Sequence, residues 1–131
     1  MTRDGPLVTV LAAVALGAVL GAWMRWALSY WLNPRLEHLP LGTLTSNLIG
    51  GYLIGLAIAA FAAHPSVPPF WRLVIVTGFL GGLTTFSTFS AESVVLMQGA
   101  QWASAAVHVV AHLGGSLLAT VAGIATYRLL A

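Results

Sequence analysis

Apolar residues fill four long stretches of this chain, and short polar or proline-containing segments separate them. The stretches cover about residues 7–32, 41–63, 70–98 and 101–129. A helix of about 20 predominantly apolar residues crosses the hydrocarbon core of a bilayer, and each stretch reaches that length. The pattern therefore predicts an all-α integral membrane protein, with a single domain over residues 1–131 and four transmembrane helices.

Composition agrees with a membrane location. Hydrophobic residues make up 59% of the chain and charged residues only 6%, whereas a soluble domain has about 25% charged residues. The net charge of +2 is spread thinly along the chain and forms no basic patch, so we expect no nucleic-acid partner. Cysteine is absent, which excludes disulfides and thiolate chemistry.

Glycines and hydroxyl residues interrupt the third stretch between residues 78 and 92. Each glycine lowers helix stability by about 1 kcal/mol, and threonine and serine can bond nearby backbone groups instead of supporting a helix. We therefore expect the third helix to be broken at Gly81–Thr85, facing protein or a water-filled cavity and not lipid. Carbonyl groups freed at such a break can hold a cation, and freed amide groups can hold an anion.

Two helical spacings near this break indicate a polar pathway. Phe86 and Phe89 are three residues apart, so their rings lie on one helix face and can offer positive ring edges to an anion. In the second stretch, Thr43 and Asn47 are four residues apart on one face. Spacing alone leaves two roles for Asn47: a bond to a neighbouring helix, or an amide donor in a pore.

The fourth stretch has a polar stripe with a period of four residues. Its members are Ser104, His108, His112, Ser116 and Thr120. Polar groups facing lipid would be left unsatisfied, so we expect the stripe to line a pathway or join helices. The spacing of His108 and His112 suits a shared metal ion, but the metalloprotease signature is missing between them. We expect no metal catalysis and no enzymatic activity.

Three further residue types bear on packing and on the pathway. Gly17 and Gly21, like Gly51 and Gly55, have the spacing that permits close helix packing, although such pairs are common in glycine-rich membrane proteins. Arg25 either extends to the membrane interface or attracts anions at a pore mouth. Glu92 is the only acid of the third stretch, and we expect it near a wet vestibule or a helix end.

The arginines leave the orientation in the membrane undecided. The side that carries both termini has Arg3, Arg72 and Arg128, and the opposite side has Arg25 and Arg35. Three against two is a weak bias under the positive-inside rule. A chain that inserts in both orientations can form an antiparallel dual-topology homodimer, in which the third helices meet at the two-fold axis.

The residues expected to line the pathway are uncharged: Asn47, the hydroxyl residues of the third span and the polar stripe of the fourth. An uncharged lining favours passive movement of a small ion that accepts hydrogen bonds. These residues alone do not identify the ion. Two other classes of protein fit the sequence less well. A small multidrug exporter would need a membrane glutamate in the first span, and residues 7–32 contain none. A non-conducting assembly subunit would leave the hydroxyl and phenylalanine run without a role.

Three segments resemble the Fluc (CrcB) family of fluoride ion channels, and the likeness extends over nearly the whole chain. The segments are Gly21–Trp26, Gly42–Asn47 and Gly78–Ser90. The resemblance implies a multi-pass protein of the cell membrane that forms an antiparallel homodimer with two pores. It also implies passive, selective export of fluoride, which would lower fluoride toxicity in the cytoplasm.

The resemblance also implies roles for particular residues. Asn47, Phe86, Phe89 and Ser116 match pore positions of the family. With the polar residues noted above, the expected pore residues are Asn47, Phe86, Phe89, Thr43, Thr88, Ser116, His112 and His108. Gly81 and Thr84 match positions whose backbone carbonyls hold a structural sodium ion at the dimer axis. Arg25 matches the arginine of the family's first helix. His108 and His112 stand where hydroxyl or aromatic residues are expected, so they are a departure from the family pattern.

Overall fold

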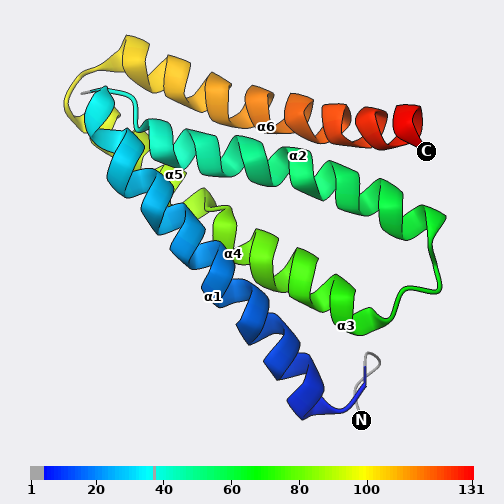
Figure 1. Ribbon diagram of the computed structural model, residues 1–131. Coiled ribbons are helices and arrows are strands. Elements are labelled where there is room, and N and C mark those ends of the chain that lie inside the picture. Colours follow the sequence, from blue (N-terminus) through cyan, green and yellow to red (C-terminus); the bar gives the residue numbers. More distant parts are fainter. Residues whose placement is uncertain (1–4, 37) are drawn as a thin grey trace.

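The computed structural model describes residues 5–36 and 38–131, and its helices follow the four predicted spans (Figure 1). Arg3, one of the arginines that entered the orientation argument, lies outside the described residues. Within these described residues, four helical segments are long and apolar enough to cross a membrane, which confirms the prediction of four spans. The continuous helices are α1 (Leu7–Leu32), α2 (Leu41–Ala63) and α6 (Trp102–Leu130). A short 3₁₀ turn, η1 (Asn33–Arg35), follows α1.

The third span consists of four consecutive pieces. These are α3 (Pro69–Arg72), the π-helix η2 (Leu73–Leu80), α4 (Gly81–Leu83) and α5 (Phe86–Gln98). The π-helix was not predicted, since nothing in its apolar sequence distinguishes it from an α-helix. Thr84 and Thr85 have extended backbone, with φ −86° and ψ 152° at Thr84, and φ −149° and ψ 114° at Thr85.

This geometry corrects the expected bounds of the interruption. We expected residues 81–85 to leave the helix together, but Gly81–Leu83 is helical and the extended backbone is confined to Thr84 and Thr85. Gly82 lies against the backbone of Ala18 in α1, and the side chain of Leu83 is fully buried. These contacts hold Gly82 and Leu83 in helical form despite the low helix propensity of glycine.

The glycines predicted to permit close packing lie where two helices approach each other backbone to backbone. A methyl group added to Gly17 or Gly21 of α1 would overlap carbonyl oxygens of η2, those of Val74 and Phe79. α2 and α6 run side by side in the same direction (Figure 1), and a methyl group added to Gly55 would overlap the carbonyl oxygen of Thr120. The close packing predicted from the glycine spacing is therefore confirmed.

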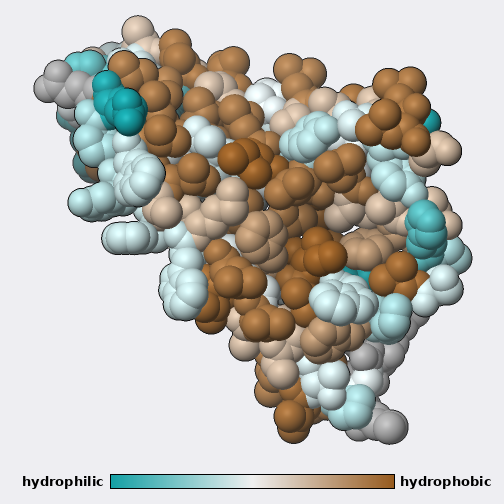
Figure 2. Space-filling view, in the orientation of Figure 1, coloured by the Kyte–Doolittle hydropathy of each residue, from teal (hydrophilic) through white to brown (hydrophobic). Residues whose placement is uncertain are grey.

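The outer surface is largely apolar. Figure 2 shows hydrophobic side chains over most of the visible face. Large apolar side chains that are more than half exposed include Trp26, Trp31, Val110, Leu117 and Leu118. A soluble monomer rarely exposes so large a contiguous apolar area, so this surface is suited to lipid or to another apolar protein face.

Candidate functional site

Asn47 of α2 joins three spans near the extended residues. Its side-chain Nδ2 donates to the carbonyl oxygen of Thr85 over 3.1 Å, and its Oδ1 accepts from the backbone N–H of Thr85 over 2.8 Å. The same Nδ2 lies 3.1 Å from Nδ1 of His112 in α6. The bond to a neighbouring helix, one of the two roles left open for Asn47, is therefore present. The amide oxygen also gives the backbone N–H of Thr85 an acceptor in place of the helical one that this N–H lacks.

Two phenylalanines of α5 lie beside this amide. The rings of Phe86 and Phe89 are edge to face with centroids 5.4 Å apart, as their spacing predicted. Phe89 is 7% exposed and stacks on His108 at 5.4 Å and on His112 at 4.8 Å. Phe86 is 70% exposed. The ring of Phe89 thus packs in the interior, whereas the ring of Phe86 lies on the surface of the chain.

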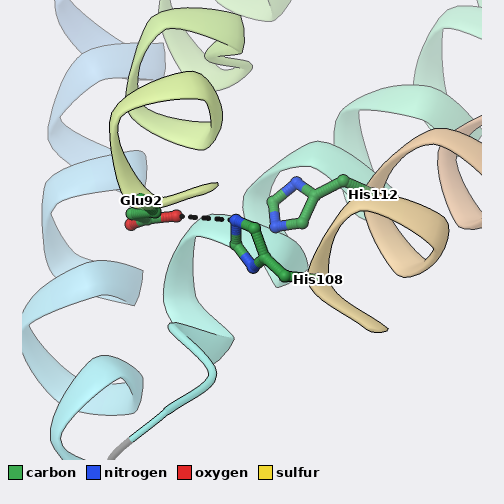
Figure 3. Close-up of side chains that lie close together, drawn as sticks. All are labelled: Glu92, His108 and His112. Atoms are coloured by element: carbon green, nitrogen blue, oxygen red, sulfur yellow. Dashed lines mark ion pairs between the residues drawn. The ribbon is translucent and has the colours of Figure 1, made fainter. Parts of the chain in front are cut away.

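Glu92 lies midway along α5, between α2 and α6. Thr43 donates its hydroxyl to Oε1 of Glu92 over 2.7 Å, and Oε2 lies 3.5 Å from Nε2 of His108 (Figure 3). The helix-end alternative is wrong, because Glu92 lies in the middle of α5 beside polar side chains of α2 and α6. A position near a wet vestibule stays a prediction. The i, i+3 series Phe86, Phe89 and Glu92 was the sequence signal that could have placed the acid on this face.

Thr88, another expected pore residue, lies in the first turn of α5. Oγ1 of Thr85 accepts from the backbone N–H of Thr88 over 3.2 Å and lies 3.0 Å from its hydroxyl oxygen. Thr85 is therefore the N-cap of α5, and Thr88 is its partner in the first turn. The structure gives Thr88 a part in helix capping.

A cavity of about 490 Å³ brings most of the predicted residues together. The predicted site residues along its wall are Asn47, Gly81, Thr84, Phe86, Phe89, His112 and Ser116. Its other lining is mainly apolar, from α2, η2 and α6. Four of the predicted site residues do not line this cavity: Thr43, Thr88, His108 and Arg25. The predicted site residues are therefore of two kinds, those on the cavity wall and those that do not reach it.

Arg25 has a backbone partner within the protein that the sequence did not indicate. Its Nε donates to the carbonyl oxygen of Gly82 over 2.9 Å, and its side chain is partly buried. The guanidinium therefore ties α1 to the segment that precedes Thr84. The two roles drawn from the sequence, extension to the membrane interface and attraction of anions at a pore mouth, stay predictions.

The fold and the site together define a multi-pass α-helical membrane protein with a cluster of polar side chains between its second, third and fourth spans. Residues 12–124 match the family model described as CrcB-like protein, Camphor Resistance (CrcB). The chain belongs to the CrcB family, which confirms the resemblance drawn from its three segments.

Relatives of nearly equal length support this membership. The fluoride-specific ion channel FluC of Cupriavidus pinatubonensis is 55% identical over 127 residues, which cover 97% of this chain and 99% of the relative. The FluC protein of Cupriavidus metallidurans is 58% identical over 119 residues, or 91% and 94% of the two chains. That of Thiobacillus denitrificans is 52% identical over 122 residues, or 93% and 98%.

Proposed function

We propose that this chain is a fluoride-selective channel that lets fluoride leave the cell passively. The observation that carries the proposal is the cavity that places the amide of Asn47 beside the rings of Phe86 and Phe89. Fluoride is small and strongly hydrated, so a narrow pathway must replace its water with donors and positive ring edges. The relatives' printed names point to the same ion.

The proposed assembly is an antiparallel homodimer with two pores. A strongly exposed Phe86 at the mouth of an open, mainly apolar cavity supports a second copy as the covering surface. Gly81 and Thr84 lie on the same wall. In the proposed dimer, their backbone carbonyls and those of the second copy hold a sodium ion at the two-fold axis, since backbone oxygens at an interrupted helix suit such a cation.

Fluoride efflux from liposomes tests this function. Purified protein in vesicles loaded with fluoride should release it when potassium flow balances the charge, and chloride should stay inside. Because Glu92 and His108 place titratable groups beside the pathway, the assay is repeated with an imposed pH gradient. Passive conduction predicts efflux set by the fluoride gradient and the voltage. Efflux that follows the proton gradient, or no efflux at all, would overturn the proposal.

Dual topology predicts labelling from both sides of the membrane. The chain has no cysteine, so a single cysteine at Arg35, in the segment after α1, is a unique target. An impermeant thiol reagent applied to intact cells should label about half of the protein, and the remainder should react only after the membrane is opened. Labelling from one side alone would contradict the antiparallel dimer.

The sodium proposal predicts a dependence on the cation and not on the threonine side chain. Replacing sodium by a large organic cation, in lithium-free buffer, should stop fluoride efflux or weaken the dimer. Thr84→Ser should keep both, because the backbone carbonyl is unchanged and serine keeps a hydroxyl for the bond to Leu80. Full activity and assembly without sodium would count against the ion.

A further inference from the structure

Glu92, His108 and His112 form a compact cluster of metal-ligating side chains behind the cavity (Figure 3). One ligand atom from each lies within 4.8 Å of the others. His108 is 0% exposed and His112 is 3% exposed. Among the described residues, no hydrogen-bond partner is found for either ring nitrogen of His108, for Nε2 of His112 or for Oε2 of Glu92. Buried polar atoms are normally paired, so this cluster is suited to a ligand.

We infer that this cluster is a binding site for a divalent transition-metal cation such as zinc. Two imidazoles and one carboxylate form a donor set that suits zinc, cobalt or nickel, whereas sodium, magnesium and calcium prefer oxygen ligands. Tetrahedral zinc with bonds of 2.0–2.1 Å places its donor atoms about 3.3 Å apart. Nε2 of His108 and Oε2 of Glu92 are already 3.5 Å apart, so small side-chain rotations would close the site.

Neighbouring side chains hold the three ligands in position. Thr43 binds Oε1 of Glu92 and leaves Oε2 directed toward His108. Phe89 stacks on both imidazole rings, whose own centroids are 4.4 Å apart. Hydrogen-bonding partners such as Thr43 orient metal ligands, and their loss commonly weakens metal binding by about 10- to 100-fold. His112 lies on the cavity wall, which gives an entering cation a path to the cluster.

Metal binding would compete with the amide of Asn47. The backbone N–H and C=O of Thr85 bond the Oδ1 and Nδ2 of Asn47, which fixes the orientation of this amide. The Nδ2 of Asn47 therefore faces His112, and Nδ1 of His112 must accept its hydrogen. A neutral imidazole that ligates through Nε2 carries its proton on Nδ1, where it can no longer accept. A cation on Nε2 of His112 therefore breaks the contact with Asn47. Under the proposed function, on which this consequence rests, the bound metal inhibits fluoride conduction.

Cobalt absorption tests the binding itself without any measurement of fluoride. Co²⁺ titrated into the purified full-length protein in detergent should produce the intense visible bands of tetrahedral coordination, at one ion per chain. His108→Ala and His112→Ala should each weaken binding at least tenfold, and Glu92→Gln should do the same. The matched control is His64→Ala, since His64 is exposed at the other end of α2. All variants are compared by gel filtration.

Two results would overturn the metal site. The first is the absence of cobalt bands in the parent protein. The second is unchanged binding in both histidine variants when they elute like the parent. If an alanine variant fails to assemble, His108→Gln and His112→Gln, which retain polar side chains of similar size, replace it in the same titration.

Fluoride efflux tests the inhibitory consequence separately. Micromolar Zn²⁺ should slow efflux at least tenfold, and a chelator should restore it. Cobalt binding with efflux unaffected by zinc would overturn the inhibition and leave the site in place. A parent protein that binds cobalt but releases no fluoride would overturn the proposed function and not the metal site.

Discussion

Asn47→Asp is expected to reduce fluoride efflux by roughly two orders of magnitude or more. Aspartate removes the NH₂ donor that faces Thr85 and His112 and places a negative charge at the cavity wall. At an effective dielectric constant near 20, two unit charges about 4 Å apart repel by about 4 kcal/mol, and each 1.4 kcal/mol is a tenfold factor. The measurement is initial efflux from liposomes containing assembled protein.

A matched control makes the same chemical change outside the cavity. Within the described part of the chain, Asn33 bonds through its Oδ1, which accepts from the backbone N–H of Gly42 over 2.7 Å and from that of Thr43 over 3.3 Å. Asn33→Asp keeps both acceptor contacts and puts the charge at the start of α2, where the helix dipole favours it. Its efflux should match the parent's. If Asn47→Asp also conducts like the parent, Asn47 is not a pore residue.

Phe89→Ile is expected to lower efflux at least tenfold while the protein still assembles. Isoleucine keeps much of the bulk and all of the apolar character of the side chain but removes the ring and its positive edge. The substitution also removes the stacking of Phe89 on His108 and His112, so the two imidazole rings lose a packing partner that they share. Phe86→Ile should reduce efflux as well, since that ring is on the same face and lines the cavity.

Phe70→Ile is the control for loss of a ring, because Phe70 packs against Trp71 near the start of the third span, away from the cavity. It should retain the parent's efflux. Parental efflux in Phe86→Ile, Phe89→Ile and Asn47→Asp alike, with assembly intact, would mean that the pathway lies elsewhere in the molecule.

The four spans were predictable because hydrophobic length is a local property of the chain. The bounds of the interruption in the third span were not, since they depend on what the glycines touch. Gly81 and Gly82 favour a break by propensity alone, yet α1 packs against Gly82 and its helical turn is kept. Thr84 and Thr85 leave the helix instead, where Asn47 offers both a donor and an acceptor to Thr85.

The site was predictable one helix at a time. Spacing placed Phe86 with Phe89, and His108 with His112, because each pair lies on a single helix face. The bond from Thr43 to Glu92 and the approach of Glu92 to His108 join different spans, so they depend on the relative rotation of packed helices. Arg25 is a similar case, because its partner is a backbone carbonyl that carries no side-chain signature.

The pairing of Asn47 with Thr85 has a consequence for the biogenesis of the protein. It joins residues 38 positions apart on successive spans. An unpaired N–H or C=O group in hydrocarbon costs several kcal/mol, so a third span that entered the bilayer alone would carry that penalty at Thr85. The ribosome makes the second span first. Asn47 is therefore already in place when Thr85 leaves the insertion machinery, and the order of synthesis provides the partner before it is needed.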